Sequence, residues 1–362
     1  MSQFDISENK DYTKRRLFLD GTVTLQRFDK VHYPRVQKYE DVQRGYIWQP
    51  EEVSVLQDRR DMRSASPAQV HMMRSNVLRQ TVLDSLQGKA PAQVFVPVCS
   101  VPELEALMYS WTFFETNIHS RSYSHIIRNA FPDPSTVFDE VHEIQEIIDM
   151  ASSIGKHYDA LYDANCQAQL GQPLDPYEHK KLIWMALHAS YALEAIRFMA
   201  SFATSLALME QGIFIGNGKI IELILQDEML HTEWTAYLIK QCVKEDPDFA
   251  KIKAEMVEEV YQLYSDCIRE EKDWVKYLVK HGNIIGLNEK ILCSFVDFKA
   301  ATALKEIGIA YREDYPRANP IPWFDKHTNL SAQQTANQEL ESGEYVVGAI
   351  SSDVDFDDLP EV

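Results

Sequence analysis

The longest helical pattern in the sequence runs from about Tyr177 to Gln211 and is apolar on nearly every side through ALHASYALEAIRFMASFATSLALM. A helix at a protein surface carries its apolar side chains in one stripe, whereas a helix that is apolar all round is buried. No part of the chain approaches about 18 uninterrupted apolar residues, the length that a membrane-spanning helix needs. The pattern therefore predicts a protein built around a central buried helix, with no membrane span.

Helical periodicity also dominates the rest of the chain, and no run of alternating strand-type residues is longer than QVFVPV. We find no internal repeat of the kind that builds solenoids. The sequence therefore predicts one large all-α domain over residues 33–324, preceded by an N-terminal arm at residues 1–32. The other helical segments are expected at about 67–87, 102–128, 139–168, 219–244, 251–281 and 289–311.

Charge and cysteine usage exclude several classes of protein. The 362 residues include 36 Lys and Arg against 55 Asp and Glu, a net charge of −19. Binding to nucleic acid or to an anionic membrane needs clustered basic side chains, so neither partner is expected. The N-terminal residues contain no apolar signal-peptide core. The five cysteines are scattered, with no Cys-x-x-Cys pair, which suits a reducing compartment, so a cytoplasmic protein is expected.

The C-terminal segment, residues 325–362, differs from the rest of the chain. No Lys or Arg follows Lys326, and residues 333–362 contain eight acidic side chains. Such a polar stretch cannot bury enough apolar area to offset the entropy lost on ordering, so we expect a disordered, flexible tail. The tail also carries spaced apolar side chains, which is typical of a segment that docks on a partner. They are Tyr345, Val346, Val347, Phe356, Leu359 and Val362.

Four acidic residues fall on helix faces that otherwise look buried: Asp84, Glu115, Glu194 and Glu228. A carboxylate in a core must be paired or must coordinate a metal ion. Two of the four have a histidine one helical turn later on the same face, because His119 follows Glu115 by four residues and His231 follows Glu228 by three. Four carboxylates and two imidazoles favour a pair of iron or manganese ions over a structural zinc.

Each of these residues also has a simpler interpretation. A lone Glu-x-x-His on a helix is usually a solvated surface pair, and a lone buried aspartate is usually capped or salt-bridged. Four such positions on four separate core helices are much harder to explain in that way. The remaining histidines with helical neighbours lack a carboxylate at ligand spacing within an apolar stretch, and we interpret them as core or surface residues. They are His71, His125, His142, His157 and His188.

Several blocks of the sequence resemble the small, radical-generating β subunit of class I ribonucleotide reductase, in particular the enterobacterial and phage class Ia type. The resemblance covers nearly the whole chain. It implies a ferritin-like helical bundle, a homodimer and two iron ions per chain, which with O₂ oxidise a nearby tyrosine to a stable radical. The blocks are WQPEEV (48–53), QTVLDSLQGKAP (80–91), IHSRSYSHIIRN (118–129), ALEAIRF (192–198), DEMLH (227–231), EKDW (271–274) and NPIPW (319–323).

The resemblance also assigns roles to individual residues. Matched motif by motif, Asp84, Glu115 and His119 would hold one iron, and Glu194, Glu228 and His231 the other. Tyr123 corresponds to the radical tyrosine, in a pocket formed by Phe198 and Phe202.

A radical-transfer route is implied as well. Trp48 would relay the radical, with Asp227 and His119 as polar links to the metal, and Tyr345 would be the outer step towards a separate large subunit. In the large subunit, the resemblance implies, ribonucleotides are reduced to deoxyribonucleotides. Taken alone, Trp48 would be interpreted as a packing tryptophan and Tyr345 as an incidental aromatic residue of the tail.

One position departs from the family pattern. The family has Glu-x-x-His before IHSRSY, whereas this chain has Glu115-x-x-x-His119, with a threonine at position 116. A π-bulge can absorb one extra residue and keep Glu115 as a ligand. Alternatively, the helix shifts phase and the first metal site is altered. Spacing by four also keeps both side chains on one face, so the sequence favours the bulge.

Two other functions fit a di-metal helical bundle. One is an oxidase or oxygenase that acts on its own small substrate, which would need a substrate pocket and has no use for a tyrosine-bearing acidic tail. The other is an iron-storage or structural bundle in which Tyr123 is merely a core residue.

Overall fold

The structure is a computed structural model that describes residues 11–328. This part of the chain is built from helices, and its only β-type pairings are two isolated bridges, Phe18 with Cys99 and Ile284 with Leu287. The all-α prediction is therefore confirmed for the described residues. Tyr345 and the rest of the predicted tail beyond Thr328 lie outside them, as do the first ten residues of the predicted N-terminal arm.

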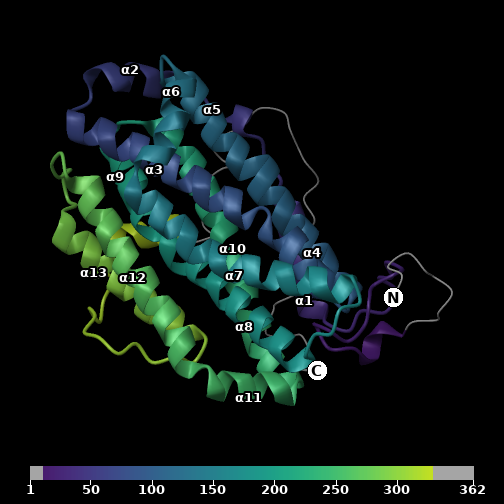
Figure 1. Cartoon of the computed structure of the whole chain (residues 1–362). Coiled ribbons are helices and arrows are strands. Elements are labelled where there is room, and N and C mark those ends of the chain that lie inside the picture. The colour runs from purple at the N-terminus through teal and green to yellow at the C-terminus, as the bar shows by residue number, and fades with distance from the viewer. Residues whose placement is uncertain (1–10, 329–362) are drawn as a thin grey trace.

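Long helices run roughly side by side through the middle of the molecule, with shorter helices at their ends (Figure 1). The α-helices are α1 Pro34–Gly45, α2 Leu56–Ser64, α3 Pro67–Gln87, α4 Pro102–Phe113, α5 Ser120–Ala130, α6 Pro134–Asp139, α7 Gln145–Gln169, α8 Pro176–Ala192, α9 Met199–Glu210, α10 Ile215–Glu245, α11 Pro247–Glu255, α12 Val257–Val279 and α13 Glu289–Glu306. Three π-helical turns lie at Pro91–Phe95, Phe114–His119 and Leu193–Arg197.

Local sequence signals explain where several helices begin. At α3, Ser66 and Gln69 form a reciprocal capping box and Pro67 occupies the first turn. Asp133, Asp175 and Asp246 cap α6, α8 and α11 in the same general way, because each side chain accepts a hydrogen bond from a backbone N–H of the first turn.

The predicted central helix is formed by α8, the π-helical turn Leu193–Arg197 and α9, which follow one another without a loop. Every side chain from Ala186 to Leu208 is buried. This run packs against α10, and α3 packs against α9 and α5. The helices that carry the candidate ligands thus surround a core that excludes water.

Two glycines allow helix α10 to approach other segments closely. A Cβ at Gly216 of α10 would lie 2.5 Å from the Ser54 carbonyl oxygen, and one at Gly218 would overlap the Met209 side chain of α9. Both glycines lie inside α10, which begins at Ile215, whereas the predicted segment 219–244 begins after them.

The other predicted boundaries differ from the structure in three places. The segment predicted at 251–281 is two helices, α11 and α12, separated by Met256. The segment predicted from 139 begins at Gln145, because residues 140–143 form a 3₁₀ turn and Ile144 is extended. The segment predicted at 289–311 ends at Glu306, two residues before Gly308, whose φ of +75° ends the helix.

The ends of the described chain are attached to the helical domain. Leu17 and Phe18 of the predicted N-terminal arm are buried, and the Leu17 backbone N–H donates to Glu245 Oε1 at 2.7 Å. His327 is buried and its Nδ1 lies 2.6 Å from Glu222 Oε1 on α10. The packed structure therefore continues to the end of the 3₁₀ segment Pro322–Thr328, slightly beyond the predicted boundary at residue 324.

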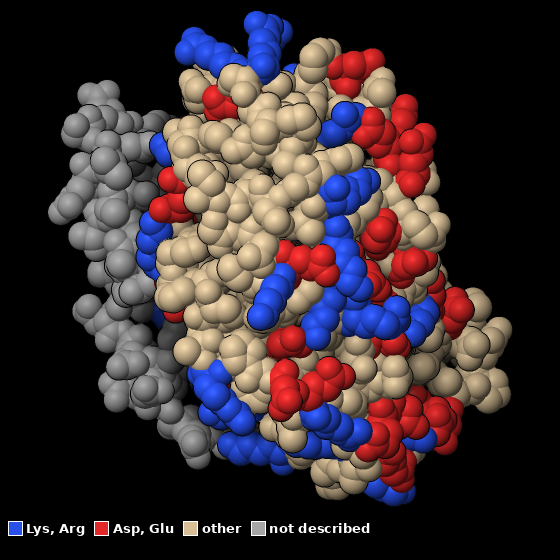
Figure 2. Space-filling model, turned by 90° about the vertical axis from the view of Figure 1, so that its left-hand side faces the viewer, with Lys and Arg blue, Asp and Glu red and all other residues tan. Residues whose placement is uncertain are grey.

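The helical run Pro176–Glu210 is long and apolar enough to cross a membrane by length and composition, but 94% of its most apolar window is buried inside the protein, as expected for a core helix. On the face shown in Figure 2, lysine and arginine side chains are mixed with aspartate and glutamate around a broad uncharged area.

Candidate metal centre

Six acidic and histidine side chains from four separate elements meet in the core. Helix α3 supplies Asp84, and α10 supplies Glu228 and His231. The π-helical turn Phe114–His119 supplies the pair Glu115 and His119, and the π-helical turn Leu193–Arg197 supplies Glu194. All six are 0% exposed, and we call them the carboxylate–histidine cluster. They fall into two groups whose ligand atoms lie within 4.8 Å of one another: Asp84, Glu115, His119 and Glu228, and Glu115, Glu194, Glu228 and His231.

In the first group, Nδ1 of His119 faces three carboxylates. It lies 3.1 Å from Glu228 Oε1, 3.3 Å from Glu115 Oε2 and 3.7 Å from Asp84 Oδ2. Glu115 and His119 therefore lie in the same group, although four residues separate them in the sequence instead of the family's three.

In the second group, Nδ1 of His231 also faces three carboxylates. It lies 2.8 Å from Glu228 Oε2, 3.1 Å from Glu115 Oε1 and 3.7 Å from Glu194 Oε2. Glu115 and Glu228 each direct one oxygen to each histidine, so these two carboxylates lie between the two groups.

The extra residue before His119 is absorbed by a π-helical turn, as the sequence favours. The turn spans Phe114–His119 and joins α4 to α5 within one continuous helix. The end of α3 approaches it closely, since a Cβ at Gly88 would lie 2.6 Å from Thr116 Oγ1 and 3.1 Å from Glu115 Cβ. The second π-helical turn, which carries Glu194, has no counterpart in the sequence analysis, where an unbroken helix is expected.

The cluster contains buried polar atoms that no protein group satisfies. Both carboxylate oxygens of Asp84 and both of Glu194 have no hydrogen-bond partner in the described structure. A buried carboxylate without a partner is costly, whereas a divalent cation would satisfy several such oxygens at once. Carboxylate oxygens with one imidazole per group suit iron or manganese. The residues present therefore fit two metal ions.

Protons stabilise the cluster when no metal is bound. Burial and the charge of Glu115 raise the pKa of Asp84 well above its usual range, and burial and Glu228 do the same to the pKa of Glu194. Burial opposes the charged form of His231, but Glu228 and Glu115 outweigh it and raise the pKa of His231 to about 9. Metal ions therefore compete with protons for this site.

Asp227 connects His119 to a tryptophan. Its Oδ2 accepts a hydrogen bond from Trp48 Nε1 at 3.0 Å and lies 3.1 Å from His119 Nε2. Gln43 Nε2 donates to the other oxygen of Asp227 at 3.1 Å. A metal-binding histidine is commonly oriented by a carboxylate on its second ring nitrogen. The structure thus brings together all three residues of the implied inner relay.

Tyr123 is fully buried on α5, four residues after His119. Its hydroxyl has no hydrogen-bond partner in the described structure. Burial, followed by the electrostatic effect of the Asp84 carboxyl group, raises the pKa of Tyr123 well above its usual range. Phe198 and Phe202 are also fully buried and stack on each other with ring centroids 5.1 Å apart. Their contact with Tyr123 stays a prediction.

Sequence reasoning missed three residues near the cluster. Trp111 Nε1 donates to Glu115 Oε1 at 3.1 Å, and Trp234 lies with its ring centroid 4.6 Å from that of His231. Both could have been found, because they stand four residues before Glu115 and three after His231. Gln43 had no such signal, since it lies far from Asp227 in the sequence.

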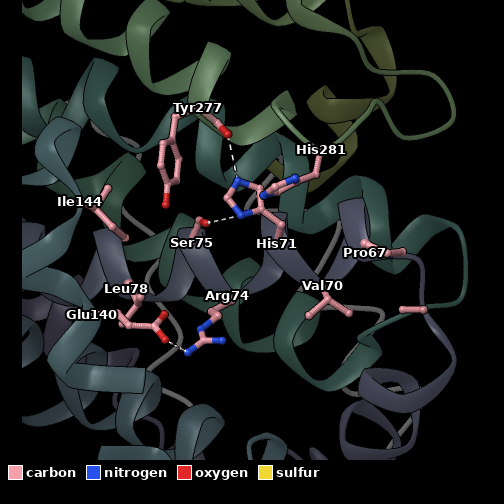
Figure 3. Close-up of a pocket in the computed structure, with 11 residues that line it drawn as sticks. Pro67, Val70, His71, Arg74, Ser75, Leu78, Glu140, Ile144, Tyr277 and His281 are labelled. Atoms are coloured by element: carbon pink, nitrogen blue, oxygen red, sulfur yellow. Dashed lines mark hydrogen bonds and ion pairs between the residues drawn. The ribbon is translucent and has the colours of Figure 1, made fainter. Parts of the chain in front are cut away.

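The surface pocket in Figure 3 is separate from this centre. It has a volume of about 460 Å³ and lies between the first turns of α3 and the end of α12. His71 Nε2 lies 2.9 Å from the Tyr277 carbonyl oxygen, and Ser75 Oγ lies 3.4 Å from Nδ1. No lining residue belongs to the carboxylate–histidine cluster, and His71 is half-buried. Within residues 11–328, none of the five histidines set aside in the sequence analysis belongs to either ligand group.

Comparison with known proteins assigns the chain to a family. The sequence profile described as "Ribonucleotide reductase, small chain" matches residues 26–320. The chain is also 38% identical, over 99% of both sequences, to the ribonucleoside-diphosphate reductase 1 subunit beta of Escherichia coli O157:H7. The chain belongs to the ribonucleotide reductase small-chain family.

Other members of the small-chain family align along nearly the whole chain. The ribonucleoside-diphosphate reductase subunit beta of Haemophilus influenzae is 39% identical over 99% of both sequences, and that of Enterobacteria phage T4 is 33% identical over 95% of both. The fold matches solved structures as well. The R2 subunit of Clostridium botulinum superposes with a TM-score of 0.77 at 21% identity, covering 87% of this chain and 95% of that one. The dimanganese(II)-NrdF of Streptococcus sanguinis superposes with a TM-score of 0.70 at 17% identity, covering 85% of this chain and all of that one.

Proposed function

We propose that this chain is the small subunit of a ribonucleoside-diphosphate reductase, which stores an oxidising equivalent on a tyrosine and passes it to a large subunit. The enzyme is active only when both subunits are present. The observation that carries this proposal is the fully buried carboxylate–histidine cluster beside Tyr123, in a chain of this family.

The metal ligands follow from the two groups. Asp84, Glu115 and His119 would hold one ion, and Glu194, Glu228 and His231 the other; Glu115 and Glu228 belong to both groups. When bound, two iron ions supply, with O₂, the oxidising power that a phenol requires. The same oxygen and nitrogen donors also suit manganese, which is the second candidate.

Tyr123 is the proposed radical site. A phenoxyl radical survives only where solvent and thiols cannot reach it, and Tyr123 is completely buried. Its hydroxyl is protonated at neutral pH because burial and Asp84 disfavour the phenolate. Oxidation must therefore remove a proton together with the electron, and Asp84 is the acidic neighbour placed to influence that proton. Phe198 and Phe202 are proposed to protect the radical.

Trp48, Asp227 and His119 form the proposed inner relay. The continuous contact from the Trp48 indole through Asp227 Oδ2 to His119 supports it. Trp48 is 8% exposed, so the relay comes close to the surface there. Tyr345, the proposed next step, and the tail that would dock on the large subunit lie outside the described residues. We further propose a homodimer located in the cytoplasm.

The decisive test is electron paramagnetic resonance after apoprotein is mixed with Fe(II) and air. We expect a tyrosyl signal and saturation near two iron ions per chain. Tyr123→Phe should keep both irons and lose the signal. The matched control is Tyr191→Phe, which removes another buried hydroxyl, one that donates to the Ala303 carbonyl at 2.9 Å, and should keep the signal. A storage bundle would give no radical in either protein.

The role of the tail is tested with the large subunit. Deleting residues 340–362 should leave the iron content and the Tyr123 radical intact and abolish ribonucleotide reduction. A synthetic peptide of residues 343–362 should inhibit the intact pair by competition. Full turnover by the truncated protein would exclude both the docking role and Tyr345 as a relay, and would favour a self-contained oxidase.

A further inference from the structure

A second tryptophan lies against the candidate metal centre, on the side of His231. Trp234 follows His231 by three residues on α10, is fully buried, and has its ring centroid 4.6 Å from that of the histidine. Trp111 packs edge-on against Trp234 at 5.4 Å. Each histidine of the cluster therefore has its own indole, since Trp48 lies 6.5 Å from His119.

Aromatic rings continue from Trp234 to the surface. Tyr39 of α1 lies 6.4 Å from Trp234, and Tyr237 of α10 lies 6.0 Å from Tyr39. Tyr39 is buried, whereas Tyr237 is half-buried. The guanidinium of Arg35 covers both tyrosine rings, and its side chain is 40% exposed. The rings Trp234, Tyr39 and Tyr237 thus form a continuous chain, which we call the α1–α10 aromatic chain.

Within the α1–α10 aromatic chain, Trp234 and Tyr39 differ in their hydrogen bonds, and this difference sets the direction of electron flow. Trp234 Nε1 has no hydrogen-bond partner in the described structure, so an oxidised Trp234 cannot pass on its N–H proton. The Tyr39 hydroxyl donates to Glu233 Oε1 at 3.0 Å and accepts from Arg35 Nε at 2.8 Å. An indole that keeps its proton after oxidation is a strong oxidant, whereas a phenol with a proton acceptor is easier to oxidise. A positive hole therefore moves from Trp234 to Tyr39.

We propose that Trp234 and Tyr39 form a second electron path between the surface and the metal centre, separate from the Trp48–Asp227–His119 relay. The inference rests on the proposed function, because that reaction supplies the oxidant. Trp234 gives one electron to the oxidised centre and becomes an indole radical cation. Tyr39 then returns one electron to Trp234, its O–H bond breaks, and the proton passes to Glu233. This path supplies an electron to the oxidised centre when Tyr123 does not supply it.

The test uses full-length protein in a Tyr123→Phe background, which removes the competing donor. After rapid mixing of the Fe(II)-loaded protein with O₂, we expect an early tryptophan radical followed by a tyrosyl radical. Incorporation of ring-deuterated tryptophan should narrow the hyperfine structure of the first signal, and ring-deuterated tyrosine that of the second. Adding Trp234→Phe should lower the tyrosyl yield several-fold, and adding Tyr39→Phe should prolong the tryptophan signal.

The matched control is Trp184→Phe in the same background. This buried tryptophan packs against His188 and Phe249, outside the chain of rings, and its loss should leave the radical yield unchanged. Iron content is measured in every variant, so that a lost signal is not confused with lost metal. Peptide mass spectrometry after repeated oxidation should find added oxygen at Trp234 and Tyr39, and less at Tyr39 when Trp234 is phenylalanine.

The inference is overturned if Trp234→Phe and Tyr39→Phe both leave the radical yield, its decay and the oxidation pattern unchanged at full iron content. That outcome differs from failure of the proposed function, in which the unmodified protein forms no Tyr123 radical at all. If Trp234→Phe lowers iron binding, Tyr39→Phe alone decides the question, because Tyr39 lies on α1, away from every proposed ligand.

Discussion

Trp48 and His119 are linked through a single atom. Trp48 Nε1 donates to Asp227 Oδ2, and His119 Nε2 lies 3.1 Å from the same oxygen. Nδ1 of His119 faces the carboxylates, so Nε2 is free to carry the proton that Asp227 accepts. One carboxylate thus fixes the tautomer of a proposed metal ligand and the orientation of the indole.

Trp48→Phe is predicted to separate radical formation from radical transfer. The substitution removes the N–H that contacts Asp227 but leaves all six proposed ligands in place. We expect near-normal iron content and a Tyr123 radical, with turnover in the presence of the large subunit reduced about 10–100-fold or more. Iron assay, electron paramagnetic resonance and product formation measure the three quantities. Trp184→Phe is the control, and equal turnover in the two variants would exclude Trp48 from the relay.

The π-helical turn before His119 leads to a deletion experiment. Asn117 is exposed and lies within the turn Phe114–His119. Deleting Asn117 gives Glu-x-x-His and allows an ordinary α-helical turn, so the flanking helices α4 and α5 keep their phase. We predict that the deletion variant still binds two metal ions per chain. Loss of one equivalent in a metal titration would mean that this chain needs the wider turn to place Glu115.

The sequence predicted the cluster because chemistry and helical spacing agree at each of its residues. Asp84, Glu228 and His231 could be placed from periodicity alone, and the extra residue before His119 identified the π-helical turn. Contacts between distant segments were not accessible in the same way. Nothing in the local sequence brings Gln43 to Asp227, or Tyr39 to Trp234, because these contacts depend on how α1 packs against α10.

Binding of metal is predicted to release protons. The pKa of His231 is raised to about 9, so its imidazole is protonated at pH 7 in the metal-free protein, and Asp84 and Glu194 have pKa values well above their usual range. Metal coordination needs the deprotonated forms. Adding Mn(II) to apoprotein in weak buffer should therefore release at least one proton per chain, measured as a fall in pH. The affinity of the apoprotein for Mn(II) should decrease as the pH is lowered. Binding without proton release would contradict the protonated cluster.

A buried ion pair between α3 and α12 is predicted to depend on both partners. Arg79 and Glu271 are nearly inaccessible and pair directly, and Arg79 Nη1 also donates to the Arg197 carbonyl at 2.9 Å, at the end of the turn that carries Glu194. Arg79→Met should lower the free energy of unfolding by about 3–5 kcal/mol, because it leaves a buried carboxylate without its partner. The double variant Arg79→Met/Glu271→Met should recover much of that loss in urea denaturation. If the double variant recovers no stability, the loss comes from the hydrogen bond between Arg79 and the Arg197 carbonyl.

His188 is predicted to make stability fall as the pH falls. Its Nδ1 lies 2.9 Å from the Tyr264 hydroxyl oxygen, and burial, followed by the charge of Lys253, lowers the pKa of His188 to about 3. An unfolded histidine has a pKa of about 6.5. Between these two values the unfolded chain binds one proton that the folded chain does not, so this stabilising contribution is complete above pH 6.5 and is lost as the pH falls towards 3. From pH 7 to pH 5 the loss amounts to about 2 kcal/mol. In urea denaturation of apoprotein, the fall in the free energy of unfolding from pH 7 to pH 5 should be about 2 kcal/mol smaller for His188→Gln than for the unmodified protein. His142→Gln, at an exposed position, is the matched control and should leave the fall unchanged. Parallel pH profiles for the unmodified protein and His188→Gln would mean that the buried imidazole is already protonated in the folded state.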